Sequence, residues 1–269
     1  MKNNQPAIKW SGGKRNSAIA IFNHRPPFNR YYEPFVGGGA VAYVTAPTEG
    51  VCGDICKPLI QLYDNIQNNH EKVYEEYKTR WDRLQNEGHT AFGKIRNNFN
   101  RNQNPDDLLF LSRTCINGLI RFNKKGEFNS SLHLTRKGIN PSRLKAILSD
   151  WSKRLQGINF RYGDYQDTSY DIKANDFAYL DPPYFHTKGR YYYGTIDYER
   201  FLNYLDLLNQ KNVKYALSFD GKRVDRDYSV NIPKELYKRH LWLPTGNSSF
   251  KKVMEKKNEP VFESLYLNY

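Results

Sequence analysis

The chain has 269 residues, of which 39% are hydrophobic and 15% aromatic, and its 41 Lys and Arg against 28 Asp and Glu give a formal net charge of +13. The aromatic content excludes a disordered chain, and the lack of any apolar run of about 20 residues excludes a membrane-spanning helix. Three cysteines, Cys52, Cys56 and Cys115, are too few for a disulfide framework and lack zinc spacing, so we expect no metal site and a reducing, cytoplasmic environment.

Seven apolar runs bounded by turn residues are typical of buried β-strands. In chain order they are Tyr31–Val36, Val51–Ile55, Ile158–Tyr162, Phe177–Leu180, Val213–Phe219, Leu236–Leu243 and Val261–Leu267. The last two alternate in part, as edge or antiparallel strands do. Helical spacing of apolar residues predicts helices over Pro58–Tyr77 and Asp197–Asn209, with Asp197 as an N-cap. Strands that alternate with helices predict an α/β fold with a mostly parallel seven-stranded sheet and helices on both faces.

Residues 58–154 are rich in Asn, Lys and Arg and interrupt this alternation. We interpret them as a mainly helical unit inserted between the second and third strands, which leaves residues 1–57 and 155–269 as the other domain. The alternative is one continuous domain with long connections, although connections of that length are uncommon. Within the insertion, Leu119–Leu134 fits a β-hairpin with its turn at Asn123–Gly126. The net charge favours a polyanionic partner, and nucleic acid is the usual one.

Two features at the ends of predicted strands indicate a nucleoside-containing cofactor. Gly37, Gly38 and Gly39 follow the first strand, where glycine lets the backbone approach a ligand and then begin a helix. The spacing is not G-x-G-x-x-G, so a dinucleotide is not favoured. Asp54 ends the second strand, where a carboxylate can accept hydrogen bonds from both hydroxyls of a ribose.

The fourth strand ends in Asp181-Pro182-Pro183-Tyr184. Proline has no backbone N–H, so the strand must stop there while its carbonyl groups stay available as acceptors. Acceptors beside the flat face of Tyr184 suit an amino group attached to an aromatic ring. Near the N-terminus, Lys9–Arg15 contains Trp10, two glycines and Lys14, which fits a loop that closes over a cofactor.

These pieces, in this order, resemble the Dam-type (class alpha) DNA adenine-N6 methyltransferases, which use S-adenosylmethionine. The resemblance weakens after Tyr184, because Leu217–Asp220 stands where the family carries a Ser-Asn pair and residues 244–260 match only loosely. The matching stretches are Lys9–Lys14, Glu33–Gly39, Asp54–Ile55, Asn117–Asn123 with Gly126–Asn129, Gly163–Asp164 and Asp181–Tyr184.

The resemblance implies a Rossmann-like methyltransferase fold in which the insertion is a helical target-recognition domain. Asp54 would hold the ribose of S-adenosylmethionine and Asp164 the amino group of its adenine ring. The residues placed around the cofactor are Trp10, Lys14, Phe35, Gly37, Asp54, Asp164 and Asp181, and the glycine run adds Gly39.

The implied reaction is direct methyl transfer to N6 of an adenine that is rotated out of the duplex. Asp181 and the carbonyl of Pro182 would accept the amino hydrogens, with Pro183 ending the motif and Tyr184 stacking on the base. Arg121 is the candidate for a bidentate contact to guanine, and Lys124 and Lys125 for contacts to phosphate. The full set of expected DNA-binding residues is Arg96, Asn117, Arg121, Asn123, Lys124 and Lys125.

Several alternatives remain open from the sequence. The same pocket would serve cytosine N4 or an RNA adenine, and a sequence-specific DNA-binding protein without turnover is a hypothesis of another class. A small-molecule or protein amine methyltransferase needs no such charge. We expect double-stranded DNA as partner, no membrane, a monomer, and a bacterial or phage enzyme in the cytoplasm near the nucleoid. No apolar run follows Met1–Gln5, so no secretory signal is expected. GATC is the family's usual target, and a restriction endonuclease is a conceivable companion.

Overall fold

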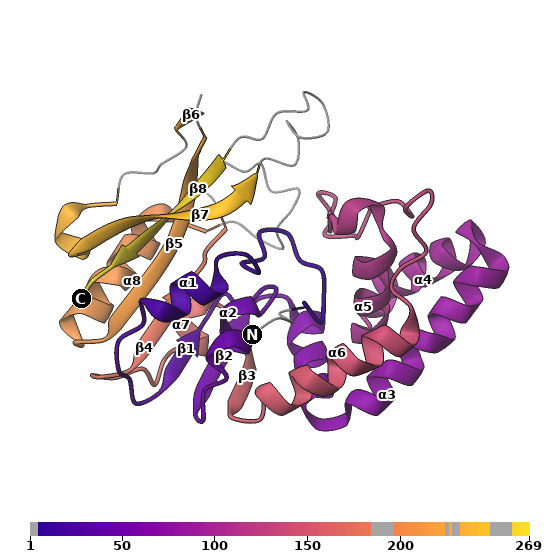
Figure 1. The fold of residues 1–269 in the computed structure, drawn as a ribbon, viewed down its shortest axis with the longest axis horizontal. Coiled ribbons are helices and arrows are strands. Elements are labelled where there is room, and N and C mark those ends of the chain that lie inside the picture. The colour runs from indigo at the N-terminus through magenta and orange to yellow at the C-terminus, as the bar shows by residue number, and fades with distance from the viewer. Residues whose placement is uncertain (1–4, 184–195, 224–225, 228–231, 248–259) are drawn as a thin grey trace.

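The computed structural model describes residues 5–183, 196–223, 226–227, 232–247 and 260–269, and Figure 1 shows the strands on one side and a group of helices on the other. The strands are β1 Tyr31–Glu33, β2 Gly50–Asp54, β3 Ile158–Tyr162, β4 Phe177–Leu180, β5 Lys214–Arg223, β6 Arg226–Asp227, β7 Arg239–Asn247 and β8 Pro260–Leu267. The helices are α1 Ala18–Asn23, α2 Ala40–Thr45, α3 Lys57–Glu87, α4 His89–Asn102, α5 Pro105–Thr114, η1 Ile116–Gly118, α6 Pro141–Arg154, α7 Tyr165–Thr168, α8 Tyr198–Gln210 and η2 Lys234–Leu236.

The strands form one mixed sheet in the order β3-β2-β1-β4-β5-β8-β7, with the short β6 paired to β5. The first five strands are parallel, and β8 runs antiparallel to both β5 and β7. The chain steps outward from β1 to β3 and then returns to place β4 on the other side of β1, where Tyr31 pairs with Phe177. The order therefore reverses between β1 and β4, and a crevice opens at such a point in α/β sheets.

Both faces of the sheet are buried, which explains why the parallel strands read as unbroken apolar runs. Successive residues of a strand enter different core clusters: Tyr31 packs with α1, α2 and α3, whereas Tyr32 packs with α7 and α8. The mostly parallel sheet with helices on both faces, predicted from the sequence, is confirmed. The predicted N-cap of α8 is also present, because the Asp197 carboxylate accepts from the backbone N–H of Arg200 at 2.7 Å.

Several predicted element boundaries were wrong: the first strand ends at Glu33 and not at Val36, and the fifth continues beyond Phe219 to Arg223. The sixth strand begins at Arg239 and not at Leu236, because Lys234–Leu236 forms a short 3-10 helix in which Leu236 is buried. The helix predicted over Pro58–Tyr77 continues to Glu87, because a second stretch with the buried Leu84 follows a break in helical geometry at Asn69.

The segment between β2 and β3 is helical, as predicted, and consists of α3, α4, α5, η1 and α6. One continuous cluster of buried side chains joins this segment to the sheet: the Tyr63 ring of α3 stacks on Trp151 of α6 and on Phe160 of β3, with ring centres 6.0 and 5.3 Å apart. The helices and the sheet therefore share a core, and the division of the chain at residues 57 and 155 stays a prediction.

The predicted hairpin at Leu119–Leu134 is present as a loop with two isolated bridges, Phe122 with Phe128 and Cys115 with Leu132, and not as two regular strands. The bridge at Phe122 and Phe128 is flanked by backbone hydrogen bonds from Asn123 to Glu127 and from Asn129 to Arg121, and the outward-facing backbone N–H and carbonyl of Phe128 bond to the side chain of Asn100, at 2.8 and 3.1 Å. The turn itself lies where the sequence predicted it, since Gly126 N–H donates to the carbonyl of Asn123 at 2.9 Å.

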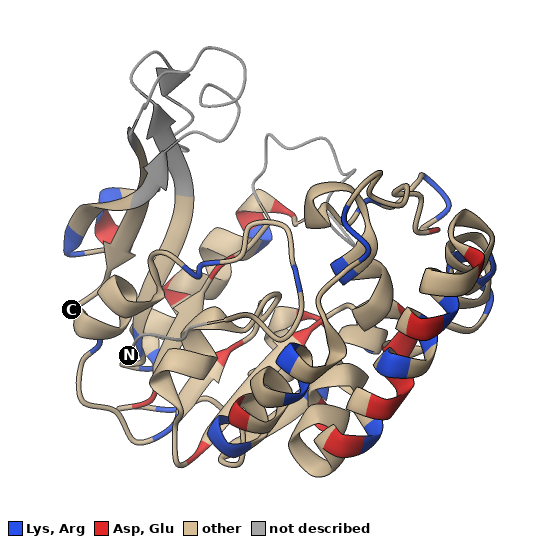
Figure 2. Cartoon of the chain, turned by 45° about the vertical axis from the view of Figure 1, so that its right-hand side comes forward, with Lys and Arg blue, Asp and Glu red and all other residues tan. Residues whose placement is uncertain are grey.

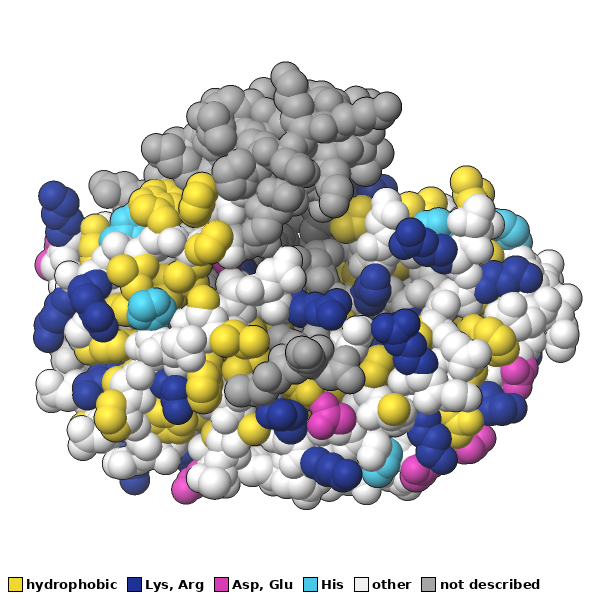
Figure 3. All heavy atoms as spheres, viewed as in Figure 1, with side chains coloured by type: hydrophobic (Ala, Val, Ile, Leu, Met, Phe, Trp, Pro, Cys, Tyr) yellow, Lys and Arg dark blue, Asp and Glu magenta, His cyan; other side chains and the backbone are white. Residues whose placement is uncertain are grey.

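Charge is unevenly distributed over the helical segment. Along α3, acidic residues are paired with basic ones one turn away, as in Lys78–Asp82 and Arg83–Glu87, and Figure 2 shows red and blue residues side by side on this helix. In Figure 3, the Lys and Arg side chains on the upper part of this face of the helical region have no Asp or Glu among them, whereas acidic and basic side chains lie together lower, toward α3. The upper part of this face therefore carries the more positive charge.

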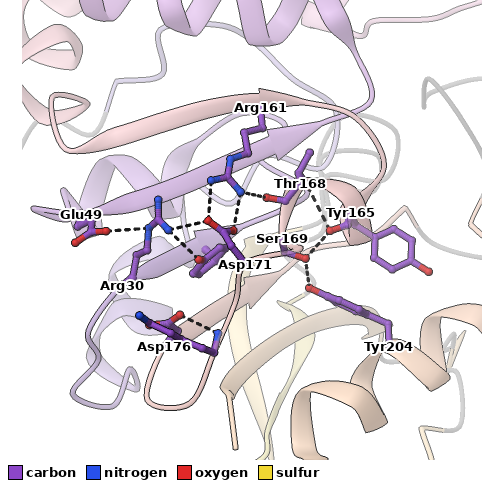
Figure 4. Close-up of polar contacts among 11 residues, drawn as sticks. Arg30, Glu49, Arg161, Tyr165, Thr168, Ser169, Asp171, Asp176 and Tyr204 are labelled. Carbon is purple, nitrogen blue, oxygen red and sulfur yellow. Dashed lines mark hydrogen bonds and ion pairs between the residues drawn. The ribbon is translucent and has the colours of Figure 1, made fainter. Parts of the chain in front are cut away.

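A polar cluster fastens the connection between β3 and β4 to the sheet (Figure 4). The Asp171 carboxylate receives two hydrogen bonds from Arg161 of β3, at 2.6 and 2.9 Å, and one from Arg30 at 2.9 Å. Arg161 also donates to the carbonyl of Thr168 at the end of α7, at 3.1 Å. These contacts fix α7 and hold the pKa of Asp171 far below its ordinary value, chiefly through the hydrogen bond from Arg161.

We expect Asp171→Asn to lower the free energy of unfolding by about 2 kcal/mol at pH 7, the order of a hydrogen bond to a charged group. Because the folded pKa of Asp171 is depressed, its contribution is full above the unfolded pKa of about 4 and declines as the pH falls below that value. Urea titrations at pH 7 and at pH 3 would measure both values, and the gap between wild type and variant should narrow at pH 3. Asp82→Asn, in an exposed pair, is the control and should change stability by less than about 0.5 kcal/mol. A gap that stays constant with pH would contradict the assignment.

Candidate active site

A cavity lies at the carboxyl ends of β1, β2 and β4, where the loops after these strands meet the N-terminal loop. All eight residues that the sequence assigned to a cofactor line it: Trp10, Lys14, Phe35, Gly37, Gly39, Asp54, Asp164 and Asp181. Pro182 and Pro183 line the same cavity, whereas Tyr184 lies outside the described residues. Segments that are far apart in the sequence therefore meet in one hollow.

The turn after β1 requires glycine at two positions. Gly37 and Gly39 have φ angles of +43° and +63°, a region that other residues rarely adopt. A Cβ atom at Gly37 would lie 2.9 Å from Cδ1 of the Trp10 ring, and one at Gly39 would lie 2.8 Å from the hydroxyl of Tyr63. The bare backbone lets Trp10 and the turn form one wall of the cavity, and Gly39 then caps α2.

Asp54 holds this turn from the end of β2. One carboxylate oxygen accepts from the backbone N–H of Gly37 at 3.1 Å and the other from that of Cys56 at 2.9 Å. Burial raises the pKa of Asp54 to about 6, against the lowering effect of the backbone N–H groups of Cys56, Gly37 and Ile55. A carboxylate has about four acceptor positions, so Asp54 can still accept from a ligand hydroxyl group in the cavity.

Asp164 is the N-cap of α7 and accepts from the backbone N–H of Gln166 at 3.1 Å. Arg200 of α8 binds both carboxylate oxygens, at 2.8 and 3.1 Å, and its guanidinium lies 5.2 Å from the centre of the Tyr165 ring. This bidentate contact fixes the orientation of the carboxylate. Oδ2 accepts from Arg200 alone in these contacts and so has room for one more donor, such as a ring amino group.

Asp181 lies beside a buried lysine that is shared by two carboxylates. Lys14 Nζ is 2.9 Å from Oδ1 of Asp181 and also forms an ion pair and hydrogen bond with Oε1 of Glu263 on β8. Lys14 is 7% exposed and Glu263 5%, so all three charges meet largely out of water. Burial raises the pKa of Asp181, the positive charge of Lys14 lowers it, and the negative charge of Glu263 raises it again.

Glu33, at the end of β1, is a further carboxyl group in the wall of the cavity. The hydroxyl of Tyr31 donates to it at 2.6 Å. Burial raises the pKa of Glu33 to about 8, the Tyr31 hydrogen bond lowers it, and the nearby Asp181 raises it. A proton is therefore favoured on Glu33 at neutral pH.

The residues assigned to DNA lie on the helical segment, away from the cavity lining. Asn117, Arg121, Lys124 and Lys125 are exposed, whereas Phe122 is buried and anchors the loop. Asn123 and Arg96 are half-buried and line a groove shared by α4 and this loop. The Asn123 side chain binds the backbone N–H groups of residues 125 and 127 and the carboxylate of Glu127, so its first role is to hold the turn.

Sequence reasoning missed three charged residues of the cavity region: Glu33, Arg200 and Glu263. Glu33 lies in the stretch Glu33–Gly39 that carries the resemblance, but the sequence indicates no role for it. Glu263 carried a usable signal, since it is a charged residue inside a predicted strand of otherwise apolar and small residues. Arg200 carried none, because its place near Asp164 depends on how α8 packs against the sheet.

The described residues contain no helix long and apolar enough to cross a membrane, and no group of three or more His, Cys, Asp and Glu side chains that could hold a metal ion. The three cysteines are buried and free.

Comparison with known proteins agrees with this geometry. A Type II methyltransferase of Methanocaldococcus jannaschii, M.MjaIII, is 29% identical to the chain over 98% of this chain and 99% of that protein. A DNA adenine methylase of Serratia marcescens is 31% identical over 68% of each chain, and a DNA N-6-adenine-methyltransferase of Escherichia phage P1 is 34% identical over 66% of this chain and 24% of that protein. The sequence pattern of one family, the D12 class N6 adenine-specific DNA methyltransferases, matches residues 10–246. These residues include the lining of the cavity and the helical segment, and the chain therefore belongs to this family.

Proposed function

We propose that this adenine-specific DNA methyltransferase uses S-adenosylmethionine as its methyl donor and that the cavity beside β1 and β4 holds both the donor and a rotated-out adenine. One observation carries the proposal: the Asp181-Pro182 strand end lies in the same cavity as the glycine turn and Asp54. A site for an amino group and a site for a nucleoside are thereby combined.

The side chains of the cavity fit S-adenosylmethionine in four respects. Asp54 can accept from ribose hydroxyls and Asp164 from the adenine amino group, while Phe35, stacked on Tyr165 with ring centres 5.1 Å apart, offers an apolar wall for the ring. Two acidic side chains, Asp181 and Glu263, lie beside the single lysine Lys14, and this excess of acidic groups suits a positively charged ligand. When bound, S-adenosylmethionine supplies an electrophilic methyl group on a positively charged sulfur.

The protein has to improve a weak nucleophile, because the lone pair of an exocyclic amino group is delocalised into its ring. Asp181 and the carbonyl of Pro182 would each accept one amino hydrogen, which orients the nitrogen and stabilises the positive charge that develops on it. Asp181 must be ionised to do this, and Lys14 favours the ionised form.

The target amino group is out of reach inside a duplex, so the base must leave the stack, at a cost of a few kcal/mol. Phosphate contacts by the exposed Lys124 and Lys125 and a base contact by Arg121 would supply binding free energy and register. The same loop is anchored to α4 through Asn100, which gives these side chains a fixed base.

The first experiment incubates the protein with methyl-labelled S-adenosylmethionine and unmethylated genomic DNA, followed by digestion to nucleosides and mass spectrometry. N6-Methyladenine is the expected product, and its positions in the sequence give the target, GATC included. N4-Methylcytosine would contradict the adenine assignment. Binding of cofactor and DNA without any methylated base would contradict the reaction and favour a DNA-binding protein without turnover.

Asp181→Asn should reduce kcat by at least about 10²-fold, the usual cost of losing one charge-stabilising contact. The amide keeps the shape of the side chain but presents N–H groups where acceptors are needed. Single-turnover assays would measure the rate, and calorimetry should find cofactor affinity changed far less. A variant with near-normal kcat would contradict the role of Asp181.

Asp54→Asn should weaken the binding of S-adenosylmethionine by about 10- to 100-fold, because hydrogen bonds to a charged acceptor contribute about 1.5–3 kcal/mol. Isothermal calorimetry measures this directly, and fluorescence titration should give an unchanged affinity for DNA. Asp64→Asn, an exposed change on α3, is the matched control and should leave both affinities unaltered. Equal losses for cofactor and DNA would indicate damage to the fold.

Arg121→Ala and the double variant Lys124→Ala/Lys125→Ala should differ in kind. The first should lower discrimination against altered sites by about 1–3 kcal/mol, whereas the second should weaken binding to all sequences and reduce the salt slope by about one per lysine. Titrations at several salt concentrations on target and altered duplexes separate the two effects. Lys173→Ala is the control, because Lys173 is exposed in the connection that leads into the amino end of β4, at the opposite end of that strand from Asp181. A reduced salt slope with unchanged discrimination for Arg121→Ala would assign Arg121 to phosphate.

A further inference from the structure

The C-terminal strand brings a buried carboxylate to the proposed reaction site. Glu263 of β8 lies opposite Leu243 of β7 and Gly221 of β5. The register of β5 against β8 shifts between Phe219 and Gly221, next to this position, and the register of β7 shifts between Pro244 and Gly246. Each irregularity adds one residue to a neighbouring strand, β5 or β7, while β8 stays regular, and bulges are frequent next to active sites. Glu263 also lies beyond residues 10–246, the part of the chain that matches the family pattern.

The contacts of Glu263 reach Asp181 through one side chain. Lys14 Nζ touches both carboxylates, and its residue is 249 positions away from Glu263 in the sequence. A buried charge without a partner is costly. If Asp181 were the sole partner of Lys14, the two groups would form a neutral ion pair. With Glu263 as a second partner, two acidic side chains share one lysine, a surplus of one acidic group.

The proposed reaction needs this surplus of acidic groups. In the proposed mechanism positive charge moves onto the amino nitrogen next to Asp181, and a carboxylate fully neutralised by a lysine stabilises it less. We propose that Glu263 is a positioning residue for methyl transfer: by sharing Lys14, it holds Asp181 in place while leaving it net negative charge. This inference rests on the proposed function of Asp181.

The groups that face Asp181 come from several elements. Among the described residues they are Lys14 of the N-terminal loop, Glu33 of β1, Tyr179 of β4 and Glu263 of β8. Burial keeps Glu33 and Tyr179 protonated at neutral pH, since it raises the pKa of each. Lys14 and Glu263 are therefore the charges that set the state of Asp181, and Glu263 raises its pKa while Lys14 lowers it.

The test is Glu263→Gln, which keeps the size of the side chain and removes its charge. We expect kcat to fall about tenfold, less than for loss of a direct contact, with the affinities for cofactor and DNA unchanged. Because kcat requires ionised Asp181 and Glu263 raises the pKa of Asp181, the acid limb of the pH–kcat profile should move to lower pH in the variant. Glu263→Asp, which keeps the charge, should recover part of the rate.

Two controls separate this role from a structural one. Glu235→Gln makes the same change of charge on the exposed η2 and should change neither kcat nor the profile. In a Lys14→Met background Glu263→Gln should have little further effect on kcat, because the two residues act as a unit. Wild-type kcat with an unmoved acid limb, or an equal loss in the Lys14→Met background, would overturn the proposal.

A readout without turnover distinguishes failure of this inference from failure of the proposed function. The titration of Asp181 can be followed by carboxyl ¹³C NMR in ligand-free protein, with the signal assigned from Asp181→Asn. A lower pKa in Glu263→Gln supports the coupling even if no methylated base is formed, and that result would reject the proposed reaction alone. An unchanged pKa in an enzyme that methylates DNA would reject the inference alone.

Discussion

The parallel pairing of β1 with β4 is the constraint on which the site depends. These neighbours belong to opposite halves of the sheet, so the loops that leave their carboxyl ends diverge and open a crevice between them. The glycine turn follows β1 and Asp181 follows β4, which brings a backbone wall and the Asp181 carboxylate to the two sides of one hollow. A slip of one residue in this pairing would turn the alternating Tyr31 and Tyr32 to the wrong cores, so burial on both faces fixes the geometry of the crevice.

Placing Lys14, Asp181 and Glu263 largely out of water is expensive, and pairing offsets the cost without making the cluster a strong source of stability. Its value lies elsewhere, because electrostatic interactions are stronger in a site of low dielectric constant than in water. A preorganised negative charge there needs no solvent rearrangement when positive charge develops nearby. Arg200 likewise fixes the orientation of the Asp164 carboxylate before any ligand arrives.

Local signals in the sequence were sufficient for the strands and for the residues that follow their ends. Glycines that need positive φ, such as Gly37, and prolines that end a strand, such as Pro182, act within a few residues and can be recognised without a fold. Glu263 and Arg200 could not be assigned in this way. Glu263 reaches Lys14 because β8 pairs with β5 beside the N-terminal loop, and Arg200 reaches Asp164 because α8 packs against α7. Such contacts depend on tertiary packing, which apolar periodicity does not encode.

Helix α3 connects the two parts of the proposed machinery. It begins just after Asp54, and its Tyr63 hydroxyl donates to the carbonyl of Gly37 at 2.8 Å, so its first turns support the glycine turn. Farther along, the Tyr77 hydroxyl donates to the carbonyl of Ile139 at 2.9 Å and holds the segment that leads into α6. The helices share one hydrophobic core with the sheet, so the surface where DNA is proposed to bind and the cavity belong to one continuous packed body. The distance between the exposed loop and the cavity is thereby fixed by packing, which is the condition for a base to be delivered to Asp181 in a reproducible position.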